Sequence, residues 1–493
     1  MKTMMNSLSR LLTLGAPVPL ACALLLAGCA VGPDYQRPDA PASPAFKEAP
    51  ADAEAWTGEW KTAEPQDAQA RPQWWQVFGD SELDALMSQV QISNQNIKAA
   101  EAQYRQALAS LQAARAGFFP NVDAQAGVSR ARGTSGNTLN GQSATLGATW
   151  ELDVWGRVRR QVESSEASAQ ASQADLASTL LSTQATLAQS YFLLRIADAQ
   201  KALLDRTVAD YAKSLQLVQN QYKAGTAQRS DVLQSESQLK SAQAQQLDIQ
   251  ITRAQLEHAI AVLVGKPPSE LTLGQADFAT TPPRVPVAVP SQLLERRPDI
   301  GAAERRMAAA NAQIGVAQAA YYPTLSLSAS GGLTASTLAR WMSLPDRIWS
   351  LGAGLAGTLF DGGLRSAAKA QAVAAYDQTV ANYRQTVLGA FQEVEDNLAA
   401  QRLLEQEAVV QDDAVRAARD ALALVNNRYR AGTASLLDVL VAQTTAYTAE
   451  RTALTLMGRQ YTTSVVLIKA LGGGWHQEEP GLGAAPAATV GQR

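Results

Sequence analysis

Cysteine and histidine are almost absent from this sequence. Its 493 residues contain two cysteines, Cys22 and Cys29, and two histidines, His258 and His476. Thiolates and imidazoles are the usual protein ligands of zinc and haem, and histidine is the commonest general base, so the chain has few of the residues that such sites need. We therefore expect no metal site, and no disulfide framework can be built.

A large excess of charge of either sign is also missing. The chain has 42 Lys and Arg against 45 Asp and Glu, which leaves a formal net charge of −3. That balance argues against nucleic acid as a partner. No glycine-rich loop with phosphate-binding spacing follows an apolar strand either. We expect a protein that is not an enzyme and that uses no dissociable cofactor.

The N-terminus reads as an export signal. Lys2 and Arg10 precede the apolar run "VPLACALLLAG", which is too short to span a bilayer, and "LAGC" ends at Cys29. This ending resembles the bacterial lipoprotein box. The resemblance implies that residues 1–28 are a signal peptide and that Cys29 becomes the lipidated first residue of the mature chain. An ordinary signal peptide with an incidental cysteine is the alternative.

Two further segments lack the pattern of a folded domain. Residues 29–72 are rich in proline, which predicts an extended tether; the prolines are Pro33, Pro38, Pro41, Pro44, Pro50, Pro65 and Pro72. Residues 473–493 form a Gly/Ala/Pro tail that we expect to be flexible.

Between these ends the sequence repeats itself. "YKAGTAQRSDVL" begins at Tyr222 and "YRAGTASLLDVL" begins at Tyr429, an offset of 429 − 222 = 207 positions. The aromatic pair and proline at 118–120 recur at 321–323 with nearly the same offset. We therefore divide the chain into a first repeat, 73–290, and a second repeat, 291–472.

Each repeat shows a helical period first. Apolar residues recur at alternating spacings of four and three before Tyr222 and before Tyr429, which is the pattern of helices packed as coiled coils. No proline interrupts residues 157–223 or 365–430. The sequence predicts long helices there, returning helices over 228–264 and 435–470, and shorter helices over 83–117 and 291–320. Two shorter helices placed end to end match one long helix, so we expect a rod.

Each repeat also shows a period of two. Small apolar residues alternate with polar ones in four segments of about ten residues, a pattern typical of outer-membrane barrel strands. Aromatic residues lie at the ends of these segments, as in a membrane-interface girdle; they are Phe118, Phe119, Trp150, Trp155, Tyr321, Tyr322 and Trp349. Four strands of a soluble sheet are the alternative.

Four strands cannot close a barrel, and an open edge in lipid leaves backbone groups unpaired at a cost of several kcal/mol each. Closure therefore requires further copies of the chain. Two copies supply eight strands and hardly any bore, whereas three supply twelve strands and a wide lumen. We expect an α+β membrane protein in which a long α-helical coiled-coil barrel joins a transmembrane β-barrel, with four strands per chain and twelve in a trimer.

Several motifs occur in a fixed order along the chain, and they resemble the TolC/OprM/NodT family of outer-membrane factors, most closely its lipoprotein NodT branch. They are "LAGCAVGPDY", "WWQVFGDSELDAL", "WELDVWGRVRR", "ERRPDI", "FDGG" and the two "AGTA…DVL" turns. The resemblance covers nearly all of the mature chain. It implies a trimeric channel-tunnel in the outer membrane that reaches into the periplasm and serves as the passive exit duct of a tripartite efflux pump for drugs or other small toxic compounds.

The resemblance also implies partners and a periplasmic entrance. The partners are a periplasmic adaptor, an inner-membrane transporter, most often of the resistance-nodulation-division class, and outer-membrane lipid. Gly225-Thr226 and Gly432-Thr433 form the turns at the rod's tip. Asp438 and Asp231 line the entrance, where a ring of carboxylates would raise their pKa values and attract cations.

Several alternatives remain open for the entrance and for the whole chain. Asp438 fits a capping box with Ser435 as well as an entrance ring, although the first repeat has Gln228 in place of that serine. The sequence departs from TolC-like entrances at Val441, Ala434 and Ala227, so the usual second acid and locking ion pair are in doubt. The whole chain could instead be a lipid-anchored periplasmic coiled-coil scaffold, or a duct for type I protein secretion or metal efflux.

Overall fold

The computed structural model describes residues 30–41, 46–48, 73–132, 134, 136, 138–276, 283, 297–335 and 347–473. The chain divides into two compact units. The sheet unit comprises Met1–Ala40, Glu101–Asp175 and Asp299–Thr386, and the hairpin unit comprises Pro41–Ala100, Leu176–Pro298 and Val387–Arg493. Cys29, Cys22 and His476 lie outside the described residues.

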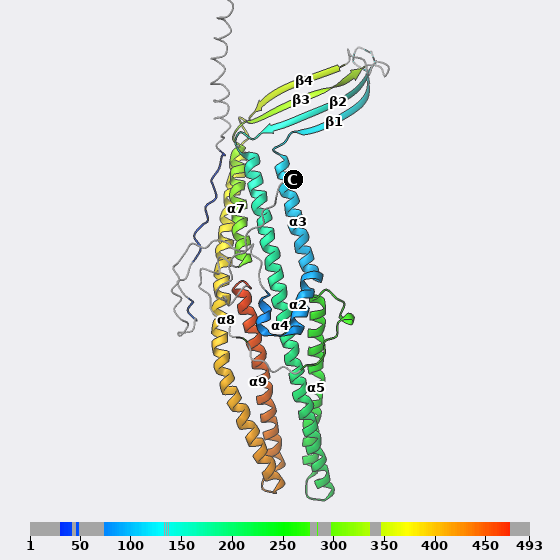
Figure 1. Ribbon diagram of the computed structural model, residues 1–493, viewed down its shortest axis with the longest axis vertical. Coiled ribbons are helices and arrows are strands. Elements are labelled where there is room, and N and C mark those ends of the chain that lie inside the picture. Colours follow the sequence, from blue (N-terminus) through cyan, green and yellow to red (C-terminus); the bar gives the residue numbers. More distant parts are fainter. Residues whose placement is uncertain are drawn as a thin grey trace, which may run out of the picture. The chain divides into compact units, whose positions relative to one another are not determined.

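Helices account for most of the described chain (Figure 1). In chain order they are η1 (Trp74–Phe78), α2 (Ser81–Ser93), α3 (Gln95–Ala116), α4 (Arg157–Lys223), α5 (Arg229–Leu263), η2 (Pro268–Glu270), α7 (Pro298–Ala319), α8 (Leu364–Arg430) and α9 (Leu436–Ala470). None of the helices among the described residues combines the length and the hydropathy needed to cross a bilayer.

The long and the returning helices match the sequence prediction within a residue or two at each end. α4 and α8 have 67 residues each, and α5 and α9 have 35 each. Both long helices begin just after an aspartate whose carboxylate accepts backbone N–H groups of the first turn. Asp153 accepts from Val158 at 2.8 Å, and Asp361 accepts from Arg365 at 3.2 Å. These caps satisfy donors that have no partner within a helix, which explains why both helices start at that point.

The single helix expected over 83–117 is wrong, because the structure breaks it at Asn94. The Asn94 side chain accepts the N–H groups of Asn96 and Ile97 and donates to the carbonyl of Leu263 at 2.7 Å. An asparagine that bonds to backbone groups offers the chain an alternative to continuing the helix. α2 therefore ends at Ser93 and α3 begins at Gln95.

Two other boundaries differ or fall outside the structure. Of the helix expected over 291–320, α7 covers Pro298–Ala319, and Pro298 stands at its first position, where its missing N–H leaves no helical hydrogen bond unmade. Residues 291–296 lie outside the described residues. The last strand ends at Ala356, and Leu359, which continues the same alternation of residues in the sequence, lies beyond it and is fully exposed.

The four strands form one antiparallel sheet in the order β1-β2-β3-β4. They are β1 (Asn121–Arg132), β2 (Thr138–Leu152), β3 (Thr324–Ala335) and β4 (Arg347–Ala356). The registers run without a bulge, for example from Asn121 opposite Thr149 to Arg132 opposite Thr138. Side chains of successive residues therefore alternate strictly between two faces.

The largest apolar core lies in the hairpin unit. Phe192 of α4 stacks on Tyr461 of α9 with ring centroids 4.6 Å apart, and Phe78 contacts Phe192 at 4.7 Å. Leu83 and Met87 of α2 are fully buried in the same cluster. This core joins elements from both repeats, so neither repeat completes it alone.

Candidate functional site

One face of the sheet is apolar from edge to edge. Its rows follow from the register: Val122 lies opposite Ala148, Ala148 opposite Ala329, and Ala329 opposite Leu351. Neighbouring rows add Leu146, Trp150, Leu325, Leu327, Trp349, Ala353 and Leu355. Several of these side chains are largely exposed, including Leu351 at 76% and Trp349 at 78%. A face of this composition suits contact with lipid.

The opposite face is polar and built from small side chains. A typical row reads Asp123, Gly147, Ser330 and Ser350 across the four strands. Glycine on this face leaves room for its neighbours: a Cβ added at Gly147 would lie 3.0 Å from Asp123 Oδ1. Small polar residues on one face and apolar residues on the other are expected of strands that separate lipid from a water-filled lumen.

Charge is sparse on the polar face. Among the described side chains of the strands, Asp123 and Glu151 are the only ionisable groups on it. The Glu151 carboxylate accepts hydrogen bonds from Arg157 Nε at 2.9 Å and Nη2 at 2.7 Å, which neutralises it. Asp123 accepts one hydrogen bond, from the Gln125 amide at 3.2 Å. Asp123 is therefore the uncompensated charge of this face.

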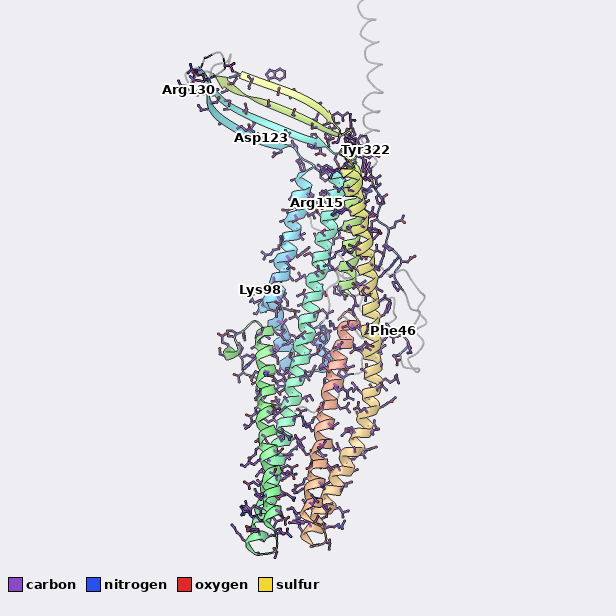
Figure 2. The ribbon with its side chains drawn as sticks, turned by 180° about the vertical axis from the view of Figure 1, so that it is seen from behind. Phe46, Lys98, Arg115, Asp123, Arg130 and Tyr322 are labelled. Carbon is purple, nitrogen blue, oxygen red and sulfur yellow. The ribbon has the colours of Figure 1, made fainter. Side chains whose placement is uncertain are left out.

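Aromatic residues gather at the end of the sheet that joins the helices. The indole of Trp155 donates to the carbonyl of Pro323 at 2.8 Å. It also stacks on the Tyr322 ring, with the ring centroids 4.8 Å apart. The indole of Trp150 donates to the carbonyl of Phe118 at 3.0 Å. Aromatic groups with a bonded polar atom and an exposed ring fit a membrane interface. Figure 2 shows Tyr322 at this end and Arg130 at the other, with Asp123 between them.

The two tip turns have the same geometry. Gly225 and Gly432 both have a φ of +75°, the left-handed conformation that a glycine adopts without strain. The N–H of Thr226 donates to the carbonyl of Gln221 at 2.9 Å, and Thr433 donates to Arg428 at 2.9 Å. These bonds close a Schellman motif at the end of each long helix. The repeated Ala-Gly-Thr-Ala segment therefore encodes a helix stop followed by a reversal.

Asp231 and Asp438 follow these turns, and both cap the helix that they begin. The Asp438 carboxylate accepts from the Ser435 N–H at 2.9 Å and from the Ser435 hydroxyl at 2.8 Å. Asp231 accepts from the backbone N–H of Gln228 at 3.0 Å. The lack of a serine in the first repeat does not abolish this cap, because Asp231 bonds to a backbone N–H that every residue except proline supplies. The two aspartates lie in different hairpins of one chain.

Local hydrogen bonding also fixes the charge of Asp438. Hydrogen bonds from the Ser435 hydroxyl, which has the larger effect, and from the Ser435 backbone N–H hold the pKa of the Asp438 carboxyl below its ordinary value. The carboxylate is exposed, as are Leu437 at 60% and Val441 at 58%. Asp438, Leu437 and Val441 are therefore exposed together near the tip turn, and whether these residues face a common axis stays a prediction.

Contacts between the two hairpins hold the tips together. The Tyr429 hydroxyl donates to Gln221 at 2.7 Å, and Val218 packs with Leu436 and Leu440. Above them a groove of about 680 Å³ runs between α5 and α9, with side chains of α4 on its floor. Its lining mixes Gln, Ser and Thr with aliphatic and tyrosine side chains, and Arg451 is its one ionised residue, so the groove is nearly uncharged.

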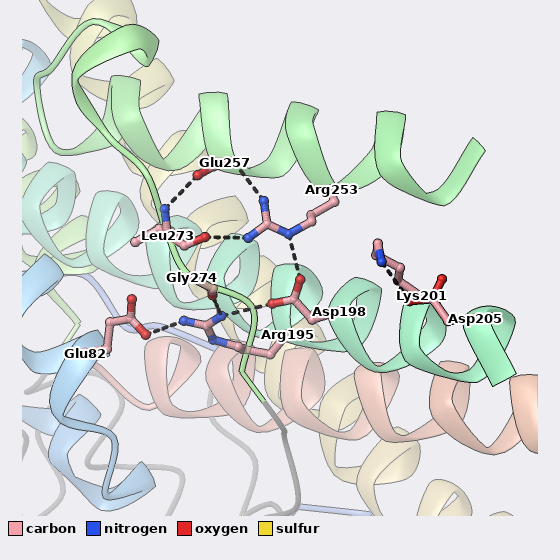
Figure 3. A network of polar contacts seen from close by, with 9 residues as sticks. All are labelled: Glu82, Arg195, Asp198, Lys201, Asp205, Arg253, Glu257, Leu273 and Gly274. Atoms are coloured by element: carbon pink, nitrogen blue, oxygen red, sulfur yellow. Dashed lines mark hydrogen bonds and ion pairs between the residues drawn. The ribbon is translucent and has the colours of Figure 1, made fainter. Parts of the chain in front are cut away.

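A network of charged groups within the hairpin unit was not found by sequence reasoning (Figure 3). The Asp198 side chain, which is 2% exposed, accepts from Arg195 at 3.0 Å and from Arg253 at 2.7 Å. Arg195 also pairs with Glu82, and its guanidinium donates to the carbonyl of Gly274 at 2.7 Å. The network fixes the segment after α5 onto α4. Buried arginines look like surface residues in a helical pattern, so no signal marked them.

Comparison with known proteins gives a consistent answer. The model of the outer membrane efflux protein family matches residues 86–266 and again residues 289–473. The toluene efflux pump outer membrane protein TtgC of Pseudomonas putida is 32% identical over 466 residues, which cover 92% of this chain and 95% of that protein. The cation efflux system protein CusC of Escherichia coli is 28% identical over 470 residues, which cover 93% of this chain and 99% of that protein.

Solved structures agree in fold. The outer-membrane channel OprN superposes with a TM-score of 0.81 at 32% identity, over 91% of this chain and all of that one. The MtrE outer membrane channel of Neisseria gonorrhoeae, in its open state, gives a TM-score of 0.78 at 28% identity, over 90% of this chain and 98% of that one. With both repeats matched by the family model and relatives aligned over nearly their whole length, the chain belongs to the outer membrane efflux protein family.

Proposed function

We propose that three copies of this outer-membrane efflux channel form one continuous exit duct, the outermost part of a tripartite pump. The observation that carries the proposal is the sheet: four strands, an apolar face, a polar face and two unpaired edges. β1 pairs only with β2, and β4 pairs only with β3, among the described residues. In lipid, such edges are stable only when they pair with other copies.

Three copies are favoured by the count of strands. Twelve strands enclose a water-filled lumen, whereas eight leave a bore that side chains fill. The small residues of the polar face, mostly Gly, Ser and Thr, would widen that lumen further. Each chain also contributes two helix hairpins, α4–α5 and α8–α9, so a trimer presents six tip turns around its periplasmic mouth.

The partners follow from the same assignment. We propose a periplasmic adaptor that contacts the helices and an inner-membrane transporter, of the resistance-nodulation-division class, that delivers the cargo. The duct itself carries out no reaction and needs no cofactor. Relatives are named for toluene, pyoverdine and cation export, so membership of the family does not fix the cargo.

Small toxic organic compounds are the proposed cargo. The groove between α5 and α9 and the polar face of the sheet carry little charge, which suits passage of varied solutes without tight binding. Metal cations are a second candidate, favoured by the similarity to CusC over nearly the whole chain. Deletion of the gene should raise accumulation of pump substrates in cells, and complementation should restore efflux. Unchanged accumulation of both classes would contradict the export role.

The proposed lipid anchor is Cys29. Residues just after it are held in the sheet unit: Arg160 of α4 donates to the carbonyls of Val31 and Gly32 and pairs with Asp34 at 2.8 Å. A lipid on Cys29 would therefore be tethered close to the start of α4. Mass spectrometry of the mature N-terminal peptide should find an acylated Cys29, with residues 1–28 removed. A free N-terminus at another residue would refute the anchor without affecting the duct.

Native mass spectrometry of the detergent-extracted protein tests the trimer. Three copies are expected. Two copies would keep the barrel but contradict the choice of twelve strands, and a conducting monomer would end the closure proposal.

A further inference from the structure

The apolar face of the sheet carries arginines at one end only. Arg130 and Arg132 are the last two residues of β1 on this face, because the unbroken register keeps them in line with Val122 and Val128. Arg347 is the first residue of β4, and it lies opposite Leu333 on the same face. All three lie at the end of the sheet away from the helices, as Figure 2 shows for Arg130.

The composition of the face changes along each edge strand in the same way. From the helix end, β1 presents Val122, Ala124, Ala126 and Val128, and then the two arginines. From the helix end, β4 presents Leu355, Ala353, Leu351, Trp349 and then Arg347. Both strands pass from apolar residues to cations, and β4 has Trp349 between the two, which is the order in which a strand meets acyl chains, the interface and the headgroups.

The length of the strand agrees with this order. Asn121 and Arg130 are nine residues apart, which is about 31 Å along a strand and about 23 Å along the membrane normal at a tilt of about 40°. The apolar band of an outer-membrane barrel is about 25 Å tall. Arg130 therefore reaches the far boundary of the band when the aromatic residues beside Asn121 mark the near one.

Within the described residues, these arginines have little to neutralise them. Arg130 and Arg347 are exposed, and no acidic group pairs with either within the described part of the chain. Arg132 donates from Nε to the carbonyl of Gly136 at 3.2 Å, a contact inside its own turn. Guanidinium groups bind phosphate oxygens in a bidentate manner, and an interface supplies phosphates at this depth.

We propose that Arg130, Arg132 and Arg347 form a binding site for the phosphates of the phosphorylated glycolipid in the outer leaflet. The inference rests on the proposed trimer, because closure places β4 of one copy beside β1 of the next. Arg347 then faces Arg130 and Arg132 across each boundary, which makes three equal sites. One glycolipid bound there bridges two subunits and reinforces the barrel where no covalent link exists.

The test compares two double variants of the purified, delipidated protein. Arg130→Gln/Arg347→Gln removes two cations of the site and spares the Arg132 turn contact. Lys98→Gln/Arg105→Gln removes two exposed cations from α3 and serves as the matched control. Native mass spectrometry measures binding of diphosphorylated lipid A, of the same lipid without phosphates, and of inorganic phosphate alone.

The parent and the control should bind diphosphorylated lipid A equally, and the site variant should bind it about 30-fold more weakly, since each basic residue at an anionic surface contributes about a factor of five. Removal of the lipid's phosphates should weaken binding to the parent by a similar factor. Equal binding by the site variant and the control would overturn the inference. So would binding of inorganic phosphate as tight as that of the lipid.

The same spectra separate this inference from the proposed function. Trimers of all three proteins with equal lipid binding would refute the glycolipid site and leave the duct intact. A parent that is not trimeric would refute the duct itself, whatever the lipid result.

Discussion

The sheet and the hairpin tips use charge in opposite ways. The sheet separates apolar from polar residues face by face and leaves one uncompensated carboxylate, Asp123, on the polar face. The tips expose acids, but each acid is bonded to the backbone at the start of its helix. A charge in the sheet is therefore free to act on solutes, whereas a charge at the tip first serves the fold. The difference shows that an acid at a proposed entrance is not by itself a selectivity element.

The largest expected effect concerns the hairpin unit alone. Phe192→Ala should destabilise it by about 3–5 kcal/mol, because the ring fills a core shared by α4 and α9. Leu193→Ala is the control, since that neighbouring side chain is 39% exposed. Hydrogen exchange should rise in α9 and in the second half of α4 but not in the strands. Equal loss of protection in the sheet would mean that the two regions do not fold as separate units.

The second-largest expected effect is a loss of stability in the sheet alone. A Cβ added at Gly332 would lie 2.2 Å from the carbonyl oxygen of Ala144, whereas one added at Gly331 has no neighbour nearer than 4.0 Å. Gly332→Val should overpack the sheet at a cost of about 1–3 kcal/mol per chain. Trimer yield in detergent should fall for Gly332→Val and stay at the parental level for Gly331→Val. Identical yields would contradict the strand register.

Measurements of ion selectivity distinguish the roles of the Asp123 and Asp438 carboxylates. Asp123→Asn should reduce the preference for cations in bilayer recordings, because no other charge on the polar face replaces it. Asp438→Asn should reduce selectivity and divalent block as well, provided that the tips form an entrance ring. If Asp438→Asn matches the parent in both properties, Asp438 is a helix cap only, and selectivity resides in the sheet.

The smallest expected effect is a pH dependence at the tip. Ser435 lowers the pKa of Asp438, so the stabilisation is fully present above the ordinary value of 3.8 and is lost as the pH falls through the depressed pKa. Hydrogen exchange at the start of α9 should therefore rise only in strong acid, and Asp438→Asn should remove that dependence. A titration of Asp438 above 3.8 in the assembled protein would indicate repulsion within a ring of carboxylates instead.

Periodic features of this fold could be predicted from sequence, and local exceptions could not. The heptad spacing predicted α4 and α8 closely, because burial along one stripe repeats over dozens of residues, and α5 and α9 were expected as the helices that return after the turns. Alternation predicted the strands and their faces in the same way. The break at Asn94 depends on one side chain reaching the carbonyl of Leu263, a contact between segments distant in sequence.

In the candidate site too, features set by local sequence could be predicted, whereas features set by packing could not. The glycine turns were predicted from the repeated Ala-Gly-Thr-Ala, since a left-handed residue is a local requirement. The capping role of Asp231 was underestimated, because the sequence shows the side chain at position 228 but not its backbone N–H. The neutralisation of Glu151 by Arg157 and the burial of Asp198 both depend on packing, which no pattern in the sequence records.

Conductance of the purified protein in a planar bilayer tests the central claim most directly. Duct formation predicts discrete single-channel steps, present for the parent and for Gly331→Val and rare for Gly332→Val at equal protein load. A lipid-anchored scaffold would bind the membrane and conduct nothing. Absence of any steps from verified, folded parent protein would contradict the account.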